Sequence, residues 1–170
     1  IDPELTPTLY KLANEGFVFN NFYTPLHFTS TSGGECQNLL GLYPKNGNPA
    51  TLPQTGDLGT NLYFSLAQQL GREGYLVQGY HGNSNMYNRN LSHPIVGYEW
   101  HQSGVTAQES AQQRARGALT NFDGLELNDS GGLLWPQRDS HVIEASVDNY
   151  INSDQPFHVY YLTISGHMPY

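Results

Sequence analysis

The sequence predicts an α/β domain in which helices flank a mostly parallel sheet. Two segments, 75–80 (YLVQGY) and 157–164 (FHVYYLTI), combine apolar and aromatic residues over the length of a strand. Apolar residues at helical spacing precede each of them, over 62–70 and over 139–152. Strands that alternate with helices favour parallel pairing, because each helix carries the chain back to the same end of the sheet.

The N-terminal part is expected to form a helix followed by a strand. Thr6 stands at the position of a helix N-cap, and Gly16 stands where the helix should stop. Leu9 and Leu12 would form the inner face of this helix. The segment 17–23 (FVFNNFY) then predicts a short strand.

A cluster of hydroxyl groups, 29–32 (TSTS), precedes a helix expected over 35–42 (ECQNLLGL). Free backbone N–H groups and the helix dipole favour a bound phosphate or sulfate at such a place. A nucleophile at this position would act where charge on a transferred group is stabilised. Taken alone, however, the segment favours a helix cap over a catalytic role.

The remaining segments complete the expected architecture. A loop rich in Pro, Gly and Asn covers 44–59. The strand over 157–164 is too apolar on both faces for a sheet edge. Residues 102–132 receive no function, although 107–119 has the composition of a short surface helix.

Polar residues stand at the expected ends of the strands. His81 directly follows the strand over 75–80, and His167 comes three residues after the strand over 157–164. Ligands of open α/β sheets gather beyond the carboxyl ends of the strands. We therefore expect both histidines and the hydroxyl cluster to meet at one rim of the sheet.

Composition and charge exclude several classes of protein. The 15 acidic residues outnumber the 7 basic ones and give a net charge of −8, which argues against nucleic-acid binding. Cys36 is the single cysteine, so the chain forms no internal disulfide, and a buried packing role is expected for it. The sequence has no apolar run of about 20 residues and no signal-peptide pattern.

Five short motifs follow one another along the chain. They are Thr31-Ser32-x-x-Glu35, Leu42-Tyr43-Pro44, His81-Gly82-Asn83, Tyr87-Asn88-Arg89 and Ser165-Gly166-His167-Met168-Pro169-Tyr170. Their order and spacing resemble the extracellular catalytic domain of lipoteichoic acid synthases, phosphoglycerol transferases of the sulfatase and alkaline-phosphatase superfamily. The likeness weakens between Gly97 and Arg138, and the Cys-x-Pro-x-Arg motif of sulfatases proper is absent.

The resemblance implies that Thr31 is both the catalytic nucleophile and a metal ligand, with Ser32 and Thr29 as alternative hydroxyls. The metal would be Mn²⁺, with Zn²⁺ or Mg²⁺ as alternatives. In the family, the other ligands are an upstream Glu and a downstream Asp-His pair, which residues 1–170 do not include. We therefore expect a partial catalytic domain of alkaline-phosphatase/sulfatase-like fold, incomplete at both ends, that alone retains metal poorly and turns over little.

The resemblance also implies a set of substrate-binding residues. His81, Arg89 and His167 would bind the phosphate, with Arg89 offering paired donors to two oxygens. Tyr87 occupies a place where the family often has Trp and would line the glycerol pocket. Asn83 stands where some members have Asp.

The family also implies partners and a location. The substrates would be a phosphatidylglycerol-like lipid and a glycerol-phosphate polymer. The parent protein would be anchored by membrane helices outside this chain, with the domain on the extracellular face of a bacterial membrane. Two alternatives stay open: a sulfatase- or phosphodiesterase-type hydrolase, and a non-catalytic extracellular domain that binds anionic polymer.

Most of these residues also have a structural interpretation. His81 could end its strand on a backbone carbonyl, and Arg89 could form a surface ion pair. Glu35 is interpreted as a helix-start residue or a partner of a site residue rather than as a metal ligand, and Tyr160 as a core residue. Five further histidines are interpreted as structural or solvated: His27, His93, His101, His141 and His158.

Overall fold

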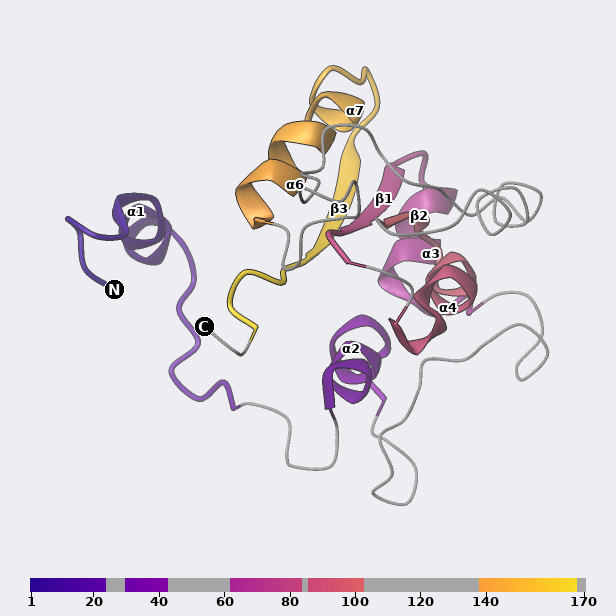
Figure 1. The fold of residues 1–170 in the computed structure, drawn as a ribbon, viewed down its shortest axis with the longest axis horizontal. Helices are drawn as coiled ribbons and strands as arrows, with labels where there is room; N and C mark the ends of the chain where they lie inside the picture. The colour runs from indigo at the N-terminus through magenta and orange to yellow at the C-terminus, as the bar shows by residue number, and fades with distance from the viewer. Residues whose placement is uncertain (24–29, 43–61, 84–85, 103–137, 168–170) are drawn as a thin grey trace, which may run out of the picture.

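A parallel sheet forms the centre of the molecule (Figure 1). The structure is a computed structural model, and it describes residues 1–23, 30–42, 62–83, 86–102 and 138–167. Three strands pair in the order β2-β1-β3, and both pairings are parallel. The strands are β1 (Leu76–His81), β2 (Glu99–Gln102) and β3 (Phe157–Leu162). The predicted α/β fold with a parallel sheet is therefore confirmed.

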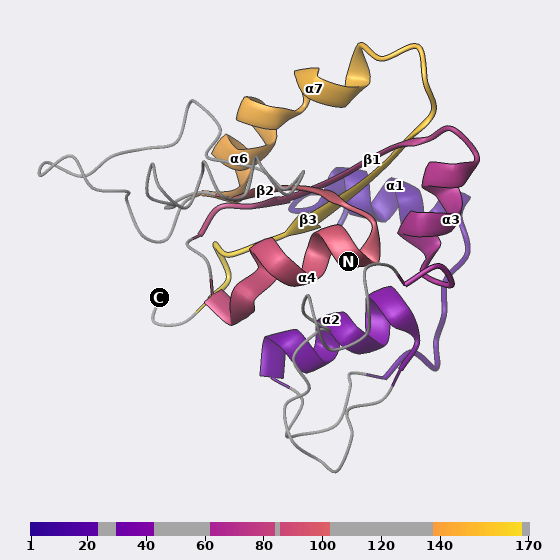
Figure 2. The same cartoon turned by 90° about the vertical axis from the view of Figure 1, so that its right-hand side faces the viewer.

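Helices cover both faces of this sheet (Figure 2). Successive side chains of a strand point to opposite faces. Val77 accordingly joins the apolar cluster on one face, and Tyr80 joins the cluster on the other. The first face is covered by α2 (Ser30–Leu40), α3 (Leu66–Arg72) and α4 (Arg89–Val96), and the second by α6 (Asp139–Ser146) and α7 (Asp148–Ile151).

The core consists of one apolar cluster on each face of the sheet. Removing these side chains from water is the main favourable contribution to folding. The cluster beneath α2, α3 and α4 contains Cys36, Leu40, Leu62, Ala67, Val77, Ile95, Val96 and Tyr98. The cluster beneath α6 and α7 contains Tyr80, Val142 and Tyr150. The buried position predicted for Cys36 is confirmed.

Capping and turn residues set the ends of the helices around the site. Ser65 caps α3, because its hydroxyl accepts a hydrogen bond from the backbone N–H of Gln68 at 3.2 Å. Beyond the end of α2, Gly41 takes a φ of +67°, a left-handed conformation common after helices. Gly97 follows α4 with a φ of +121°, and a Cβ there would lie 2.8 Å from the backbone nitrogen of Gln68.

Several element boundaries differ from the prediction. α2 begins at Ser30, five residues before the predicted start at Glu35, so Thr31 lies inside the first turn of the helix. The single helix predicted over 139–152 is two helices, α6 and α7, that meet at Val147. Neither α4 nor β2 was predicted, since α4 contains Pro94 and β2 has only 4 residues.

The N-terminal helix is present, but its predicted surroundings are not. α1 spans Pro7–Glu15 and lies apart from the sheet in Figure 1. Leu9 and Leu12, expected on an inner face, are 55% and 61% exposed. The strand predicted over 17–23 is also wrong, because these residues pair with no strand among the described residues. An apolar pattern gives a buried face only where another element covers it.

β3 corrects a further prediction. The segment was expected to be too apolar for a sheet edge, yet β3 is an outer strand of the sheet as described. After the exposed Phe157, its side chains are half-buried, because each face is covered. Tyr160 packs against the first cluster, and Val159 and Tyr161 pack against the second.

Some predictions fall on parts of the chain that the structure does not describe. The loop over 44–59, the helix over 107–119, and the residues His27 and Thr29 lie outside the described residues. Among the helices that are described, none has the length and apolar character needed to cross a membrane.

Candidate active site

A pocket of about 350 Å³ lies at the carboxyl ends of β1 and β3. The segment 162–164, where β3 ends, forms part of its wall. This is the rim at which ligands of α/β sheets gather. The six residues singled out from the sequence all line this pocket: Thr31, His81, Asn83, Tyr87, Arg89 and His167.

Thr31 brings a hydroxyl group to the pocket from the first turn of α2. Its side chain is exposed, whereas the neighbouring Ser32 is 2% exposed and does not line the pocket. The first turn of a helix carries backbone N–H groups without partners in the helix, which favour an anion. Of the two candidate hydroxyls within the described residues, Thr31 and Ser32, only Thr31 lines the pocket.

His81 ends β1, and its ring is held from behind. Its Nδ1 lies 2.9 Å from the backbone carbonyl of Leu162, which can only accept, so Nδ1 carries the proton in this contact. Burial, opposed by this hydrogen bond, lowers the pKa of His81 to about 4. The ring is therefore neutral near pH 7, with Nε2 as a hydrogen-bond acceptor. The carbonyl partner expected for His81 as a strand-end residue is present, and the same residue also lines the pocket.

Arg89 begins α4 and is only 2% exposed, so the interpretation as a surface ion-pair residue is wrong. The ring of Tyr87 lies 5.1 Å from its guanidinium carbon. Tyr87 and Asn88 both have left-handed backbones, with φ of 57° and 51°. Such conformations cost energy in residues other than glycine and are found disproportionately at functional sites.

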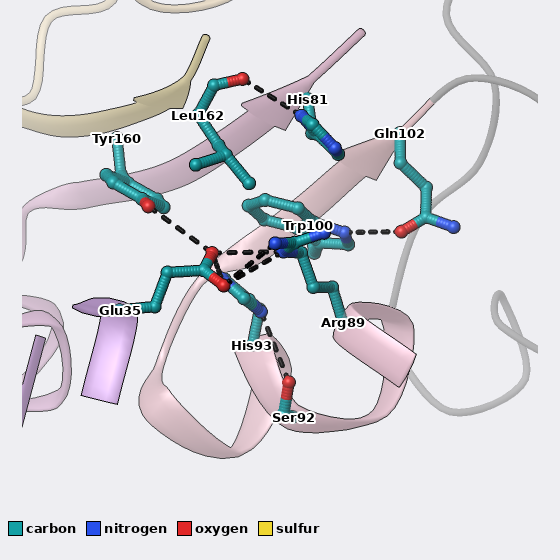
Figure 3. A network of polar contacts seen from close by, with 9 residues as sticks. All are labelled: Glu35, His81, Arg89, Ser92, His93, Trp100, Gln102, Tyr160 and Leu162. Atoms are coloured by element: carbon teal, nitrogen blue, oxygen red, sulfur yellow. Dashed lines mark hydrogen bonds and ion pairs between the residues drawn. The ribbon is translucent and has the colours of Figure 1, made fainter. Parts of the chain in front are cut away.

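A buried polar network lies directly behind Arg89 (Figure 3). Glu35 accepts from Arg89 Nε at 3.0 and 3.1 Å, and Arg89 Nη2 lies 3.0 Å from Oε2. Tyr160, interpreted as a core residue, donates its hydroxyl to Oε1 at 3.4 Å. Glu35 is the sixth residue of α2, so the alternative of a helix-start residue is wrong, and the alternative of a partner to a site residue agrees with the geometry.

His93 belongs to the same network, which agrees with the structural alternative given to it from the sequence, although its place beside Glu35 was not predicted. It is fully buried on α4, and its Nε2 lies 3.3 Å from Glu35 Oε1, off the direction that a hydrogen bond requires. Burial lowers the pKa of His93 despite the nearby carboxylate, so the imidazole is neutral near pH 7. Arg89 and His93 are four residues apart, so a predicted α4 would have indicated that both side chains lie on the same face of that helix.

The Glu35 carboxylate stays ionised inside this network. Burial is the largest influence and raises the pKa of Glu35, but the contacts with His93 and Arg89 together outweigh it. The net pKa lies below the ordinary value. The network therefore contains one buried anion, Glu35, opposite one buried cation, Arg89.

A second set of hydrogen bonds holds the segment that leads to His167. The carboxylate of Asp139, at the start of α6, accepts from the backbone N–H of Ile164 at 2.7 Å and of Ser165 at 3.0 Å. In return, the Ser165 hydroxyl accepts from the Asp139 backbone N–H at 2.8 Å. The His167 N–H donates to the Ile164 carbonyl at 2.9 Å. These bonds fix the turn that carries His167 into the pocket wall.

The described residues do not make a metal site by themselves. They contain no group of three or more His, Cys, Asp or Glu side chains placed to hold a metal ion. Glu35 lies four residues after Thr31, but its carboxylate is bound by the guanidinium of Arg89. The described donors around Thr31 therefore lack the carboxylates that such an ion requires.

The fold and the pocket define an α/β protein with a polar site at the carboxyl rim of a parallel sheet. A family model described as sulfatase matches residues 2–170, and the chain belongs to this family. The family that the sequence resembles is thereby confirmed at the level of the superfamily.

Two proteins of Bacillus subtilis (strain 168) are similar to the chain. Lipoteichoic acid synthase-like YvgJ is 20% identical over 168 residues, which cover 98% of this chain and 24% of that protein. Lipoteichoic acid synthase 2 is 25% identical over 171 residues, which cover 98% of this chain and 23% of that protein. The chain thus spans about a quarter of the length of these curated relatives. No solved structure matches it significantly.

Proposed function

We propose that the protein transfers phosphoglycerol, or a related phosphoester group, from a membrane phospholipid to a cell-envelope acceptor through a covalent intermediate on Thr31. The pocket carries this proposal, because it gathers a helix-start hydroxyl, two imidazoles and one guanidinium from distant parts of the sequence. Membership of the sulfatase family and two relatives named for lipoteichoic acid synthesis support the same chemistry.

The proposed reaction has two steps. In the first, Thr31 Oγ bonds to phosphorus while the bond from phosphorus to the diacylglycerol oxygen breaks, and the hydroxyl proton passes to that leaving oxygen. In the second, an alcohol of the acceptor attacks phosphorus, the bond to Thr31 Oγ breaks, and the proton of the alcohol returns to Oγ. The acceptor gains the phosphoglycerol unit, and Thr31 is restored.

The remaining pocket residues would bind the substrate. Arg89 donates from a planar guanidinium, which suits two phosphoryl oxygens, and His167 faces the same space. Neutral His81 has a lone pair on Nε2, so we propose that Nε2 accepts a hydrogen bond from a hydroxyl of the glycerol or of the incoming alcohol. Tyr87 and Asn83 would line the glycerol side.

A divalent metal, Mn²⁺ before Zn²⁺ or Mg²⁺, is part of the proposal through the resemblance to the family. Its remaining ligands would come from outside the described residues. From the same resemblance, we propose that the domain lies on the extracellular face of a bacterial membrane. Its partners there would be a phosphatidylglycerol-like lipid and a glycerol-phosphate polymer.

The test uses the full-length protein, a fluorescent phosphatidylglycerol, and Mn²⁺ or a chelator. We expect Mn²⁺-dependent release of diacylglycerol by the wild type and none by Thr31→Ala. Equal release by Thr31→Ala would refute the covalent role of Thr31. If the protein binds metal but releases nothing, a different ester substrate is indicated; if it binds polymer alone, it is a non-catalytic binding domain.

Hydrolysis is the second candidate function, because the Thr31 side chain is exposed and water can reach it. Analysis of the products separates the two reactions. Transfer lengthens the polymer, whereas hydrolysis releases free glycerol phosphate.

A further inference from the structure

The carboxylate of Glu35 and the guanidinium of Arg89 join two helices at the wall of the pocket (Figure 3). Arg89 presents Nε and Nη2 along one edge, at 3.0 to 3.1 Å from the carboxylate oxygens. Both side chains are 3% exposed. Water competes little at such burial, so the direction of the guanidinium is well determined by its partner.

The carboxylate also accepts a hydrogen bond from a second element of the fold. Besides Arg89, it is contacted by Tyr160 from β3 at 3.4 Å and approached by His93 from α4 at 3.3 Å. Donors from two elements thus surround Glu35, which itself does not line the pocket. Any influence of Glu35 on a bound ligand must therefore pass through another residue.

The position of Glu35 links Arg89 to the proposed nucleophile. Thr31 and Glu35 are four residues apart on α2, so they share one face of that helix. Arg89 lines the pocket together with Thr31, and Glu35 ties its guanidinium to the same helix. The ion pair thereby sets where the guanidinium lies relative to the Thr31 hydroxyl, although Glu35 and Arg89 are 54 residues apart in the sequence.

We infer that Glu35 is a positioning residue, which holds the Arg89 guanidinium at the place where it meets the phosphoryl oxygens of a substrate bound beside Thr31. The inference deepens the proposed function and rests on it for the nature of the ligand. An ion pair with only a structural role would stabilise the fold without affecting binding in the pocket. The two roles therefore predict different results.

The test uses the full-length protein and the variant Glu35→Asp, which keeps the charge but withdraws the carboxylate by about 1.5 Å. Arg89 should follow the carboxylate out of the pocket. We expect the affinity for sn-glycerol 1-phosphate, measured by calorimetry, to fall about tenfold, and kcat for diacylglycerol release to fall by up to about a hundredfold. Glu144→Asp, at an exposed position on α6, is the matched control and should change neither quantity.

The same substitution in an Arg89→Gln background separates positioning from a structural role. If Glu35 acts through Arg89, adding Glu35→Asp there changes affinity and kcat by less than about twofold. An equal loss in both backgrounds would overturn the inference. So would a folded Glu35→Asp variant with unchanged affinity and only a lower melting temperature.

A second variant covers the case in which Glu35→Asp does not fold. Glu35→Gln keeps the shape of the side chain, and its effect on kcat is compared in the same two Arg89 backgrounds. Binding is measured without turnover, so a wild type that binds glycerol phosphate but releases no diacylglycerol refutes the proposed function alone. A wild type that binds no glycerol phosphate overturns both.

Discussion

Gly79, in the middle of the central strand, is the position where one added methyl group should disturb both the fold and the site. It pairs with Trp100 across β1 and β2, and the indole ring lies over it. A Cβ at Gly79 would lie 2.7 and 2.8 Å from two ring carbons of Trp100. Carbon atoms in good contact are about 3.5–4.0 Å apart, so the ring would have to move by close to 1 Å.

Trp100 has little freedom to make that movement. It is fully buried, its Nε1–H donates to Gln102 at 2.7 Å, and its ring centroid lies 4.0 Å from that of His93. Overpacking of this kind costs about 1–3 kcal/mol, so at about 2–4 °C per kcal/mol we expect Gly79→Ala to lower the melting temperature by roughly 2–12 °C. Because His93 touches the Glu35 carboxylate, glycerol-phosphate binding should weaken as well.

Thermal unfolding followed by far-ultraviolet circular dichroism measures the effect, with Gly71→Ala as the matched control. A Cβ at Gly71, in α3, would meet only Val77 Cγ2 at 3.9 Å, an ordinary contact. Alanine is favoured over glycine in a helix by about 0.5–1 kcal/mol, so this variant should be slightly stabilised. If Gly79→Ala unfolds at or above the wild-type temperature, the packing argument for Trp100 is refuted.

Two further predictions concern the pocket wall. The pKa of His81 is about 4 in the folded protein and 6.5 ordinarily, so between these pH values the unfolded chain binds a proton that the folded protein does not. The unfolding free energy should therefore fall as the pH drops from about 6.5 to 4, by about 3 kcal/mol from His81, and urea titrations of His81→Gln should show a shallower fall. Asp139→Ala removes the acceptor that holds the turn before His167. It should lower the unfolding free energy by about 1–2 kcal/mol and weaken glycerol-phosphate binding. Asp154→Ala, at an exposed position, is the control. If the two variants bind glycerol phosphate with the same affinity in calorimetry, the role of Asp139 is contradicted.

Two of the three described strands, β1 and β3, were predictable from local patterns, and the family resemblance indicated most of the pocket residues. The apolar segments over 75–80 and 157–164 became β1 and β3 with ends shifted by two residues or fewer. The place of His81 at the rim of the sheet could be deduced from the first of these strands, since ligands bind beyond the carboxyl ends of parallel strands. The convergence of His81 and His167 at that rim was therefore deducible before any contact was known.

The failures come from places where neighbours, not local pattern, decide the outcome. Leu9 and Leu12 have the spacing of a buried helical face, but no described element covers them. α4, which carries His93, was not predicted because it contains Pro94. β2 was not predicted because it has only 4 residues. The spacing of apolar residues indicates which residues share a face of a helix, but not which element, if any, packs against that face.

Strand and helix periods in the sequence determined the fold class, because these periods are local properties. The resemblance of the short motifs to a known family indicated the superfamily and six of the residues that line the pocket. Only the tertiary structure decided that α2 starts before Thr31, and that Glu35 accepts from Arg89 inside the protein. A charge is tolerated at 3% exposure only when its partner is brought to it, and packing of α2 against α4 supplies that partner. Since the two residues lie 54 positions apart, no local pattern could have paired them.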